Sequence, residues 1–183
     1  VILYHLLTAP RHAEIYCAAK DRGQAEIVYK MVKTFIEESP ELSKIFKIYK
    51  TTNTIENIKT NATFKPLTSD GGSNNGLNPY FIVADELHAW EGQGTSSKAK
   101  EFWEVLSSGS GAQKSSQLLV ISTAGSNEDT TILGSLYKFG KQVSEGLIND
   151  DSFGFACWEA DEEDDIKDIK TWKKANPNLA EGF

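Results

Sequence analysis

The second half of the chain alternates between short apolar runs and amphipathic helical segments, and this alternation limits the possible folds more than any other feature. The apolar runs have the continuous character of strands buried on both faces: residues 80–84, 117–122 and 153–158. Helical periodicity follows each run, over residues 97–106, 130–145 and 168–175. Strands that alternate with helices form right-handed crossovers in a largely parallel sheet. The pattern therefore predicts an α/β fold whose mostly parallel sheet is covered on both faces.

The first half adds a helix and several shorter strands. Residues 1–7 have the pattern of the last turns of a helix, and residues 13–19 that of a short buried strand. Asp21 precedes Gln24 by three residues, the spacing of a capping box, and apolar residues at helical spacing continue until Pro40. Residues 45–67 alternate as strands do, which predicts short antiparallel or mixed strands at one edge of the sheet.

Composition excludes several classes of protein. With 183 residues, 39% of them hydrophobic, the chain can bury a core of its own, and one domain is the expected count. The longest apolar runs are far below the roughly 20 residues that a membrane span requires. The two cysteines, Cys17 and Cys157, lack metal-ligand spacing and are expected to be buried thiols in a reducing compartment.

Charge is unevenly distributed along the chain. The formal net charge is −7, and the acidic run at residues 159–165 supplies six of the acids; we expect this run to be a solvated surface segment. Residues 30–65 hold seven lysines against four acids, a local excess that is typical of a solvated face. Only Arg11 and Arg22 are arginines, which argues against sequence-specific nucleic-acid recognition by an arginine-rich stripe.

Two adjacent carboxylates, Asp85 and Glu86, follow the apolar run at residues 80–84 directly, as in a Walker B element. An Asp that leaves a buried strand can hold Mg²⁺ on nucleotide phosphates, while the next Glu can orient and deprotonate the attacking water. By itself the pattern also fits an exposed strand end. His88, taken alone, is more typical of a hydrogen-bonded structural histidine than of a metal ligand.

Small polar residues follow the next apolar strand along the chain: Ser122, Thr123, Ala124 and Gly125. Their hydroxyls could sense a γ-phosphate, although an N-cap and a turn would use the same residues. Ligands of parallel sheets bind beyond the carboxyl ends of the strands. We therefore expect Asp85 and Thr123 to lie on neighbouring strands, at one shared edge of the sheet.

A triphosphate site also needs a glycine-rich phosphate cradle. The only candidate spacing, Gly71 to Gly76, continues with Leu77 and Asn78 instead of Lys and Ser/Thr, and it enters a strand instead of leaving one. We reject it as a P-loop and expect a flexible loop there.

Four stretches, taken together, resemble the ATPase region of phage terminase large subunits, the motors that package DNA into procapsids. They occur in the family's order: residues 18–25, 81–90, 121–125 and 172–177. The resemblance implies a three-layer P-loop NTPase fold of the ASCE, RecA-like type, with Asp85 as the Mg²⁺-side acid and Glu86 as the catalytic base. Residues 122–125 would be the motif that couples ATP hydrolysis to DNA movement.

The resemblance also gives candidate roles to residues outside these two strands. Gln24 matches a Gln-Ala pair of the family and becomes a candidate nucleotide contact, although the capping box also explains it. A trans-acting arginine finger is expected in ring motors. Arg22 and Arg11 are the candidates for it, and Arg22 lies in a matching stretch.

Mg²⁺ and ATP are the cofactor and substrate that the resemblance implies. Its implied partners are double-stranded DNA, a portal protein, a small terminase subunit and further copies of the chain in a ring, in the host cytoplasm at the procapsid portal. The family's P-loop belongs upstream of Val1 and its nuclease domain downstream of Phe183. Residues 1–183 are therefore expected to form a single partial ATPase domain that hydrolyses ATP poorly or not at all by itself.

Two alternatives stay open at the level of sequence. Asp85-Glu86-Leu87-His88 and Ser122-Thr123-Ala124 also fit a DExH-type nucleic-acid helicase lobe. The other alternative is a prophage remnant that serves as a folded binding module without catalysis.

Overall fold

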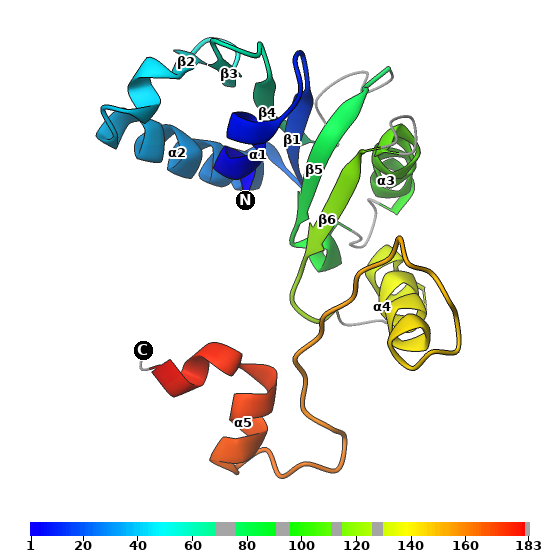
Figure 1. Cartoon of the computed structure of the whole chain (residues 1–183). Coiled ribbons are helices and arrows are strands. Elements are labelled where there is room, and N and C mark those ends of the chain that lie inside the picture. Colours follow the sequence, from blue (N-terminus) through cyan, green and yellow to red (C-terminus); the bar gives the residue numbers. More distant parts are fainter. Residues whose placement is uncertain (69–75, 91–95, 111–114, 126–129, 182–183) are drawn as a thin grey trace. The chain divides into compact units, whose positions relative to one another are not determined.

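The computed structural model describes residues 1–68, 76–90, 96–110, 115–125 and 130–181 (Figure 1). The chain forms two compact units, Val1–Gly134 and Ser135–Phe183, and each is described by itself. Most of the loop expected at residues 69–78, including Gly71, lies outside the described residues. That residues 1–183 form one partial ATPase domain stays a prediction.

Unit 1 contains a mixed sheet in which the described strands follow the order β2-β3-β4-β1-β5-β6. The strands are β1 Glu14–Ala19, β2 Phe46–Tyr49, β3 Thr54–Asn57, β4 Thr63–Thr68, β5 Pro79–Asp85 and β6 Gln117–Ile121. Strand β1 pairs in parallel with β4 and β5, and β5 pairs in parallel with β6. The antiparallel pairings, β2 with β3 and β3 with β4, lie at one edge, as expected.

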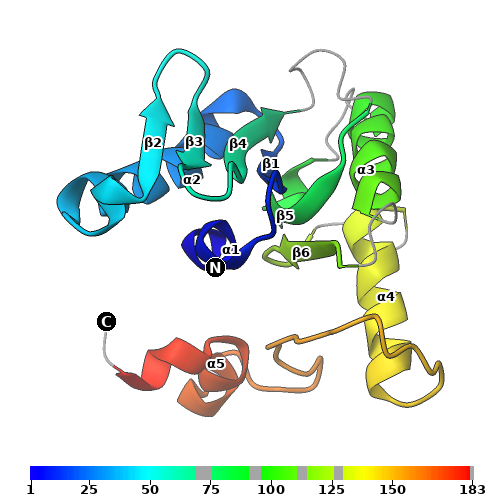
Figure 2. The same ribbon diagram turned by 45° about the horizontal axis from the view of Figure 1, so that its top comes forward.

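Helices cover both faces of this sheet, which confirms the layered α/β prediction (Figures 1 and 2). The helical elements are α1 Ile2–Thr8, α2 Arg22–Glu38, the 3₁₀ helix η1 Leu42–Lys44, the 3₁₀ helix η2 Leu87–Ala89, α3 Ser96–Ser110 and α4 Ile132–Ser144, which continues into unit 2. The main core cluster joins α1 and α2 to Ile15, Phe81 and other strand residues. On the other side, α3 packs against β5 and β6, and its Phe102 ring stacks on Trp90.

Helix α2 follows the sequence prediction closely. The Asp21 side chain accepts a hydrogen bond from the Gln24 backbone N–H at 3.1 Å, which satisfies one of the free donors of the first turn. Ala25, Tyr29, Val32 and Ile36 are buried at helical spacing, so one stripe of α2 faces the sheet. The helix ends at Glu38, before Pro40.

Unit 2 contains the rest of α4, α5 Ile169–Ala175 and the 3₁₀ helix η3 Pro177–Glu181. The strand expected at residues 153–158 is wrong: these residues form no strand and pair with none in the described part of the chain. Their alternating apolar side chains pack on a helix instead. The rings of Phe153 and Phe155 meet Phe139 and Tyr137 of α4 edge to face, at centroid distances of 4.9 and 6.0 Å.

The cysteine expectation is correct only in part, and the acidic-run expectation is confirmed. Cys17 is buried as expected, but Cys157 is exposed, because residues 153–158 lie outside any sheet. The acidic run lies at the surface, as expected, with most of its residues exposed. Lys174 Nζ of α5 lies 2.8 Å from Asp161 Oδ2 and 2.7 Å from Asp164 Oδ2, so two acids of this surface run form ion pairs.

Helices of membrane-spanning length and apolarity do not occur among the residues that the structure describes.

Candidate functional site at the carboxyl edge of β5 and β6

The acid pair and the hydroxyl-bearing turn leave neighbouring parallel strands at the same edge of the sheet. Asp85 is the last residue of β5 and pairs with Ile121, the last residue of β6. The Glu86 backbone N–H donates to the Ile121 carbonyl at 2.8 Å, which extends the ladder by one bond. The expected juxtaposition of Asp85 with the turn that contains Thr123 is therefore confirmed.

Glu86 has a left-handed backbone conformation, with φ 50° and ψ 48°. A residue with a Cβ pays about 1–2 kcal/mol for this conformation, and such strain is concentrated at functional sites. Two neighbouring hydrogen bonds hold the turn: the bond from Glu86 to Ile121, and a bond from the Trp90 indole N–H to the Asp85 carbonyl at 2.9 Å. Trp90 is itself fully buried, so the turn is anchored in the core.

His88 connects the acid pair to the hydroxyl-bearing turn. Its Nδ1 atom lies 3.2 Å from Glu86 Oε2, 3.2 Å from Ser122 Oγ and 3.2 Å from Thr123 Oγ1. Its backbone N–H also donates to Ser122 Oγ at 3.1 Å. His88 is thus a hydrogen-bonded histidine, as the sequence suggested, but its partners are the site residues themselves.

The end of the hydroxyl-bearing turn packs against the same histidine. A Cβ built on Gly125 would lie 3.7 Å from His88 Cβ, which is ordinary van der Waals contact. The turn at residues 122–125 therefore lies close to the residue that contacts Glu86.

The surroundings of Asp85 suit a magnesium–phosphate complex. Mg²⁺ commonly binds one or two carboxylates and completes its shell with phosphate and water oxygens. Asp85 can supply one such oxygen, and the described residues contain no group of three or more side chains that would form an all-protein metal site. Burial, and then the charge of Asp85, raise the pKa of Cys17 to about 12. The Cys17 thiol therefore stays protonated and adds no charge near Asp85.

The start of α2 lies at this same edge, because β1 runs parallel to β5 and leads into α2. Gln24 is exposed, and its backbone N–H serves the N-cap. Arg22 is also exposed, with its Nε atom 2.9 Å from Glu26 Oε1. Arg11 precedes β1 and therefore lies at the opposite, amino edge of the sheet. The structure brings Gln24 and Arg22 to the edge of the acid pair, and their roles stay predictions.

The family profile for the terminase large subunit ATPase domain matches residues 1–142 of the chain. The chain belongs to this family of terminase ATPase domains. The large terminase subunit of Enterobacteria phage HK97 is 26% identical over 183 residues, which cover 98% of this chain and 34% of that protein. The crystal structure of the HK97 large terminase superimposes with a TM-score of 0.82 over 97% of this chain and 35% of that one, at 26% identity.

The terminase chain thus spans about a third of the length of the HK97 relative. The fold prediction, a mostly parallel P-loop-type sheet of a terminase ATPase domain, is confirmed, and nothing favours the helicase alternative. The sequence did not reveal that His88 lies between Glu86 and the hydroxyl groups of Ser122 and Thr123. The left-handed turn at Glu86 brings His88 to Ser122 and Thr123. Residue spacing does not predict a left-handed turn at a glutamate.

Proposed function

We propose that this terminase ATPase segment supplies the residues that hydrolyse ATP, and that this hydrolysis drives double-stranded DNA into a procapsid. In this proposal Asp85 binds Mg²⁺, Glu86 is the general base, and residues 122–125 couple hydrolysis to motion. The observation that carries it is the shared edge: Asp85 pairs with Ile121, and one histidine contacts both Glu86 and Thr123. Family membership supports ATP as the substrate.

The chemistry follows from the oxygen atoms at this edge. Mg²⁺ bound beside Asp85 would neutralise charge on the β- and γ-phosphate oxygens. Glu86 would orient the attacking water and accept its proton. His88 Nδ1, 3.2 Å from Glu86 Oε2, would hold that carboxylate in position for the water. A fixed position of the Glu86 carboxylate matters, because misplacing a catalytic group by about 1 Å can lower the rate a hundredfold.

Coupling would use the other two contacts of His88 Nδ1. This nitrogen carries at most one hydrogen, so the hydroxyl groups of Ser122 and Thr123 compete with the Glu86 carboxylate for it. Loss of the γ-phosphate would change the hydrogen bonds at the carboxylate, and His88 would transmit the change to the turn after β6. This turn would then move elements that grip DNA.

The same proposal includes the remaining partners of a packaging motor. A portal protein, a small terminase subunit and a ring of further copies would surround the intact subunit in the host cytoplasm. In such a ring, Arg22 would be positioned at the exposed start of α2 to reach a neighbouring ATP site, and Gln24 would contact nucleotide. Both side chains are exposed at the edge where the acid pair lies.

The test is ATP turnover by the intact terminase large subunit that carries this segment. Glu86→Gln should lower kcat by at least about a hundredfold and leave KM nearly unchanged, because a general base acts only in the transition state. Glu38→Gln, an exposed acid at the end of α2, is the matched control and should leave both parameters unchanged.

Three outcomes would count against the proposal or its parts. Full turnover by Glu86→Gln would remove Glu86 as the base. Absence of turnover in the unsubstituted subunit would favour the non-catalytic binding module. Vigorous Mg²⁺-dependent turnover by residues 1–183 alone would contradict the expectation that this segment needs the rest of the protein.

A further inference from the structure

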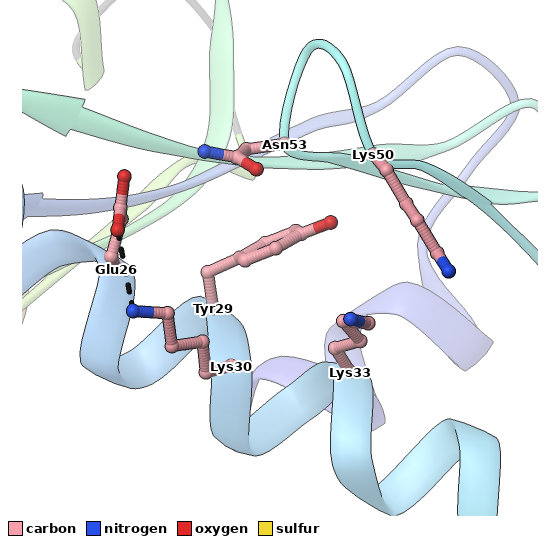
Figure 3. Close-up of a pocket in the computed structure, with 6 residues that line it drawn as sticks. All are labelled: Glu26, Tyr29, Lys30, Lys33, Lys50 and Asn53. Atoms are coloured by element: carbon pink, nitrogen blue, oxygen red, sulfur yellow. Dashed lines mark ion pairs between the residues drawn. The ribbon is translucent and has the colours of Figure 1, made fainter.

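A small cavity of about 170 Å³ lies between α2 and the turn that joins β2 to β3. Its lining residues are Glu26, Tyr29, Lys30, Lys33, Lys50 and Asn53 (Figure 3). Strands β3, β4 and β1 lie between β2 and β5 in the described sheet, so this cavity is several strands away from Asp85 and Glu86. None of the proposed catalytic roles uses it.

Tyr29 places an unsatisfied donor at this cavity. The residue is only 4% exposed, and its hydroxyl oxygen is buried without a hydrogen-bond partner among the described residues. Figure 3 shows the hydroxyl directed toward the space between Lys33 and Lys50. Burial, and then the charge of Glu37, raise the pKa of Tyr29, so the hydroxyl keeps its proton and can donate. A buried polar group without a partner is uncommon in folded proteins and calls for an explanation.

Positive charge exceeds negative charge around this donor. Lys30 Nζ lies 3.4 Å from Glu26 Oε2, and Lys33 Nζ lies 3.7 Å from Glu37 Oε1; both are long surface pairs that contribute little. Within the described residues, Lys50 makes no ion pair with a carboxylate. A tetrahedral oxyanion would accept the hydrogen bond of Tyr29 and could draw two or three ammonium groups to its remaining oxygens.

We propose that the cavity at Tyr29, Lys33 and Lys50 is a phosphate-binding site that holds one phosphodiester group of a nucleic-acid backbone. This inference rests on the proposed function, which brings DNA to the molecule. Lysines bind phosphate as flexible point charges, and tyrosine hydroxyls contact phosphate oxygens without reading sequence. Residues 30–65, which include Lys30, Lys33 and Lys50, hold seven lysines against four acids, and this excess of positive charge suits a long polyanion better than a free phosphate ion.

The experiment measures binding of a fluorescent DNA duplex to the 183-residue chain by anisotropy, over a series of salt concentrations and without nucleotide. Tyr29→Phe should weaken binding roughly tenfold, because one hydrogen bond to a charged group is lost. Lys50→Gln and Lys33→Gln should each lower the slope of log K against log salt by about one. Tyr29→Phe should leave that slope unchanged.

Lys47→Gln is the matched control, since Lys47 lies exposed on β2 over the Tyr49 ring and does not line the cavity. It should lower affinity less than Lys50→Gln does. Thermal unfolding checks the fold: Tyr29→Phe should melt at the same or a higher temperature, because it removes an unpartnered buried hydroxyl. A variant that is at least as stable but binds less tightly separates a binding role from a structural one.

Inorganic phosphate and a short single-stranded oligonucleotide identify the source of the phosphate. Tight binding of inorganic phosphate that depends on Tyr29, with no duplex binding, would overturn the nucleic-acid assignment. Equal affinity of Tyr29→Phe, Lys50→Gln and the unsubstituted chain for duplex would overturn the site itself. The binding assay contains no nucleotide, so its results are independent of the turnover test of Glu86. Either the phosphate-binding site or the catalytic role of Glu86 can therefore be disproved without the other.

Discussion

Among the residues of unit 1 that violate local preferences, Glu86 and Tyr29 lie at the two candidate sites. Glu86 has a left-handed backbone, and Tyr29 buries a hydroxyl without a described partner. Each violation costs of order 1 kcal/mol or more and persists because the surrounding structure fixes it. For Glu86 the fixing contacts are the backbone bond to Ile121 and the Trp90 bond to the Asp85 carbonyl.

The strain at Glu86 predicts a gain in stability on its removal. Glu86→Gly should raise the free energy of unfolding by about 1 kcal/mol relative to Glu86→Ala, because glycine adopts φ 50° without a Cβ penalty. Both variants lose the side-chain contact to His88, so that contact cancels in the comparison. Denaturant unfolding of the two variants measures the difference. Equal midpoints would show that the turn relaxes at no cost.

Thiol reactivity offers a second test at the residue scale. Burial raises the pKa of both thiols: that of Cys17, where the Asp85 charge also contributes, to about 12, and that of Cys157, where the Glu159 charge contributes. Cys17 is inaccessible and Cys157 exposed. Iodoacetamide should therefore label Cys157 alone in the native chain, faster as pH rises, and Cys17 only after unfolding. Native labelling of Cys17, read by peptide mass, would contradict the placement of β1.

At the scale of the element, α2 links the two candidate sites. Its first turn lies at the edge of the acid pair, and its middle presents Tyr29 and Lys33 to the cavity. Its position depends on the buried stripe that faces the sheet and on the Asp21 cap at its start. A helix held at one end and along one face keeps both groups of side chains in fixed register.

Loss of the cap should weaken α2 measurably. Asp21→Ala should lower the free energy of unfolding by about 1 kcal/mol, because the Gln24 N–H loses its acceptor. Asp21→Ser keeps a capping oxygen and should recover most of the loss. Urea denaturation of the three chains checks the prediction. An unchanged midpoint for Asp21→Ala would mean that packing alone sets the start of the helix.

At the scale of the whole molecule, the two units are held together internally by different forces. Unit 1 has an apolar core with many fully buried side chains, whereas the described residues of unit 2 are mostly exposed. In unit 2, Lys174 joins Asp161 and Asp164, and Tyr137 and Lys141 both contact Glu159. Lysine–carboxylate pairs therefore add to the aromatic contacts of unit 2, which has few buried side chains.

Unit 2 should loosen first on acidification. The hydrogen bond from Lys174 holds the pKa of Asp164 below its usual value, and the bond from Lys141, followed by that from Tyr137, lowers the pKa of Glu159. A lowered folded-state pKa stabilises the fold above the usual carboxyl range, and this contribution is lost as pH falls through the folded value. Amide hydrogen exchange at neutral pH and near about pH 3 should show protection lost in residues 135–181 before β1 and β5. Simultaneous loss in both units would contradict this.

The sequence by itself determined the elements whose signal is local. The Asp21 cap with the buried stripe of α2, the apolar strands β1, β5 and β6, and the acid pair at the end of β5 all follow from periodicity and short-range chemistry. Because parallel strands share a carboxyl edge, the approach of Asp85 to the turn at residues 122–125 was also predictable. The family of terminase ATPase domains followed from the same motifs.

Only the tertiary structure decided features that depend on partners distant in sequence. Residues 153–158 have a strand pattern, yet the rings of this segment pack on α4 and Cys157 is exposed. Alternation of apolar residues predicts which side of a segment is apolar, but it does not predict which element covers that side. His88 meets Ser122 and Thr123 through the left-handed turn at Glu86, and Tyr29 and Lys50 line one cavity between α2 and the β2–β3 turn. Such meetings arise from long-range packing, which local sequence patterns do not encode.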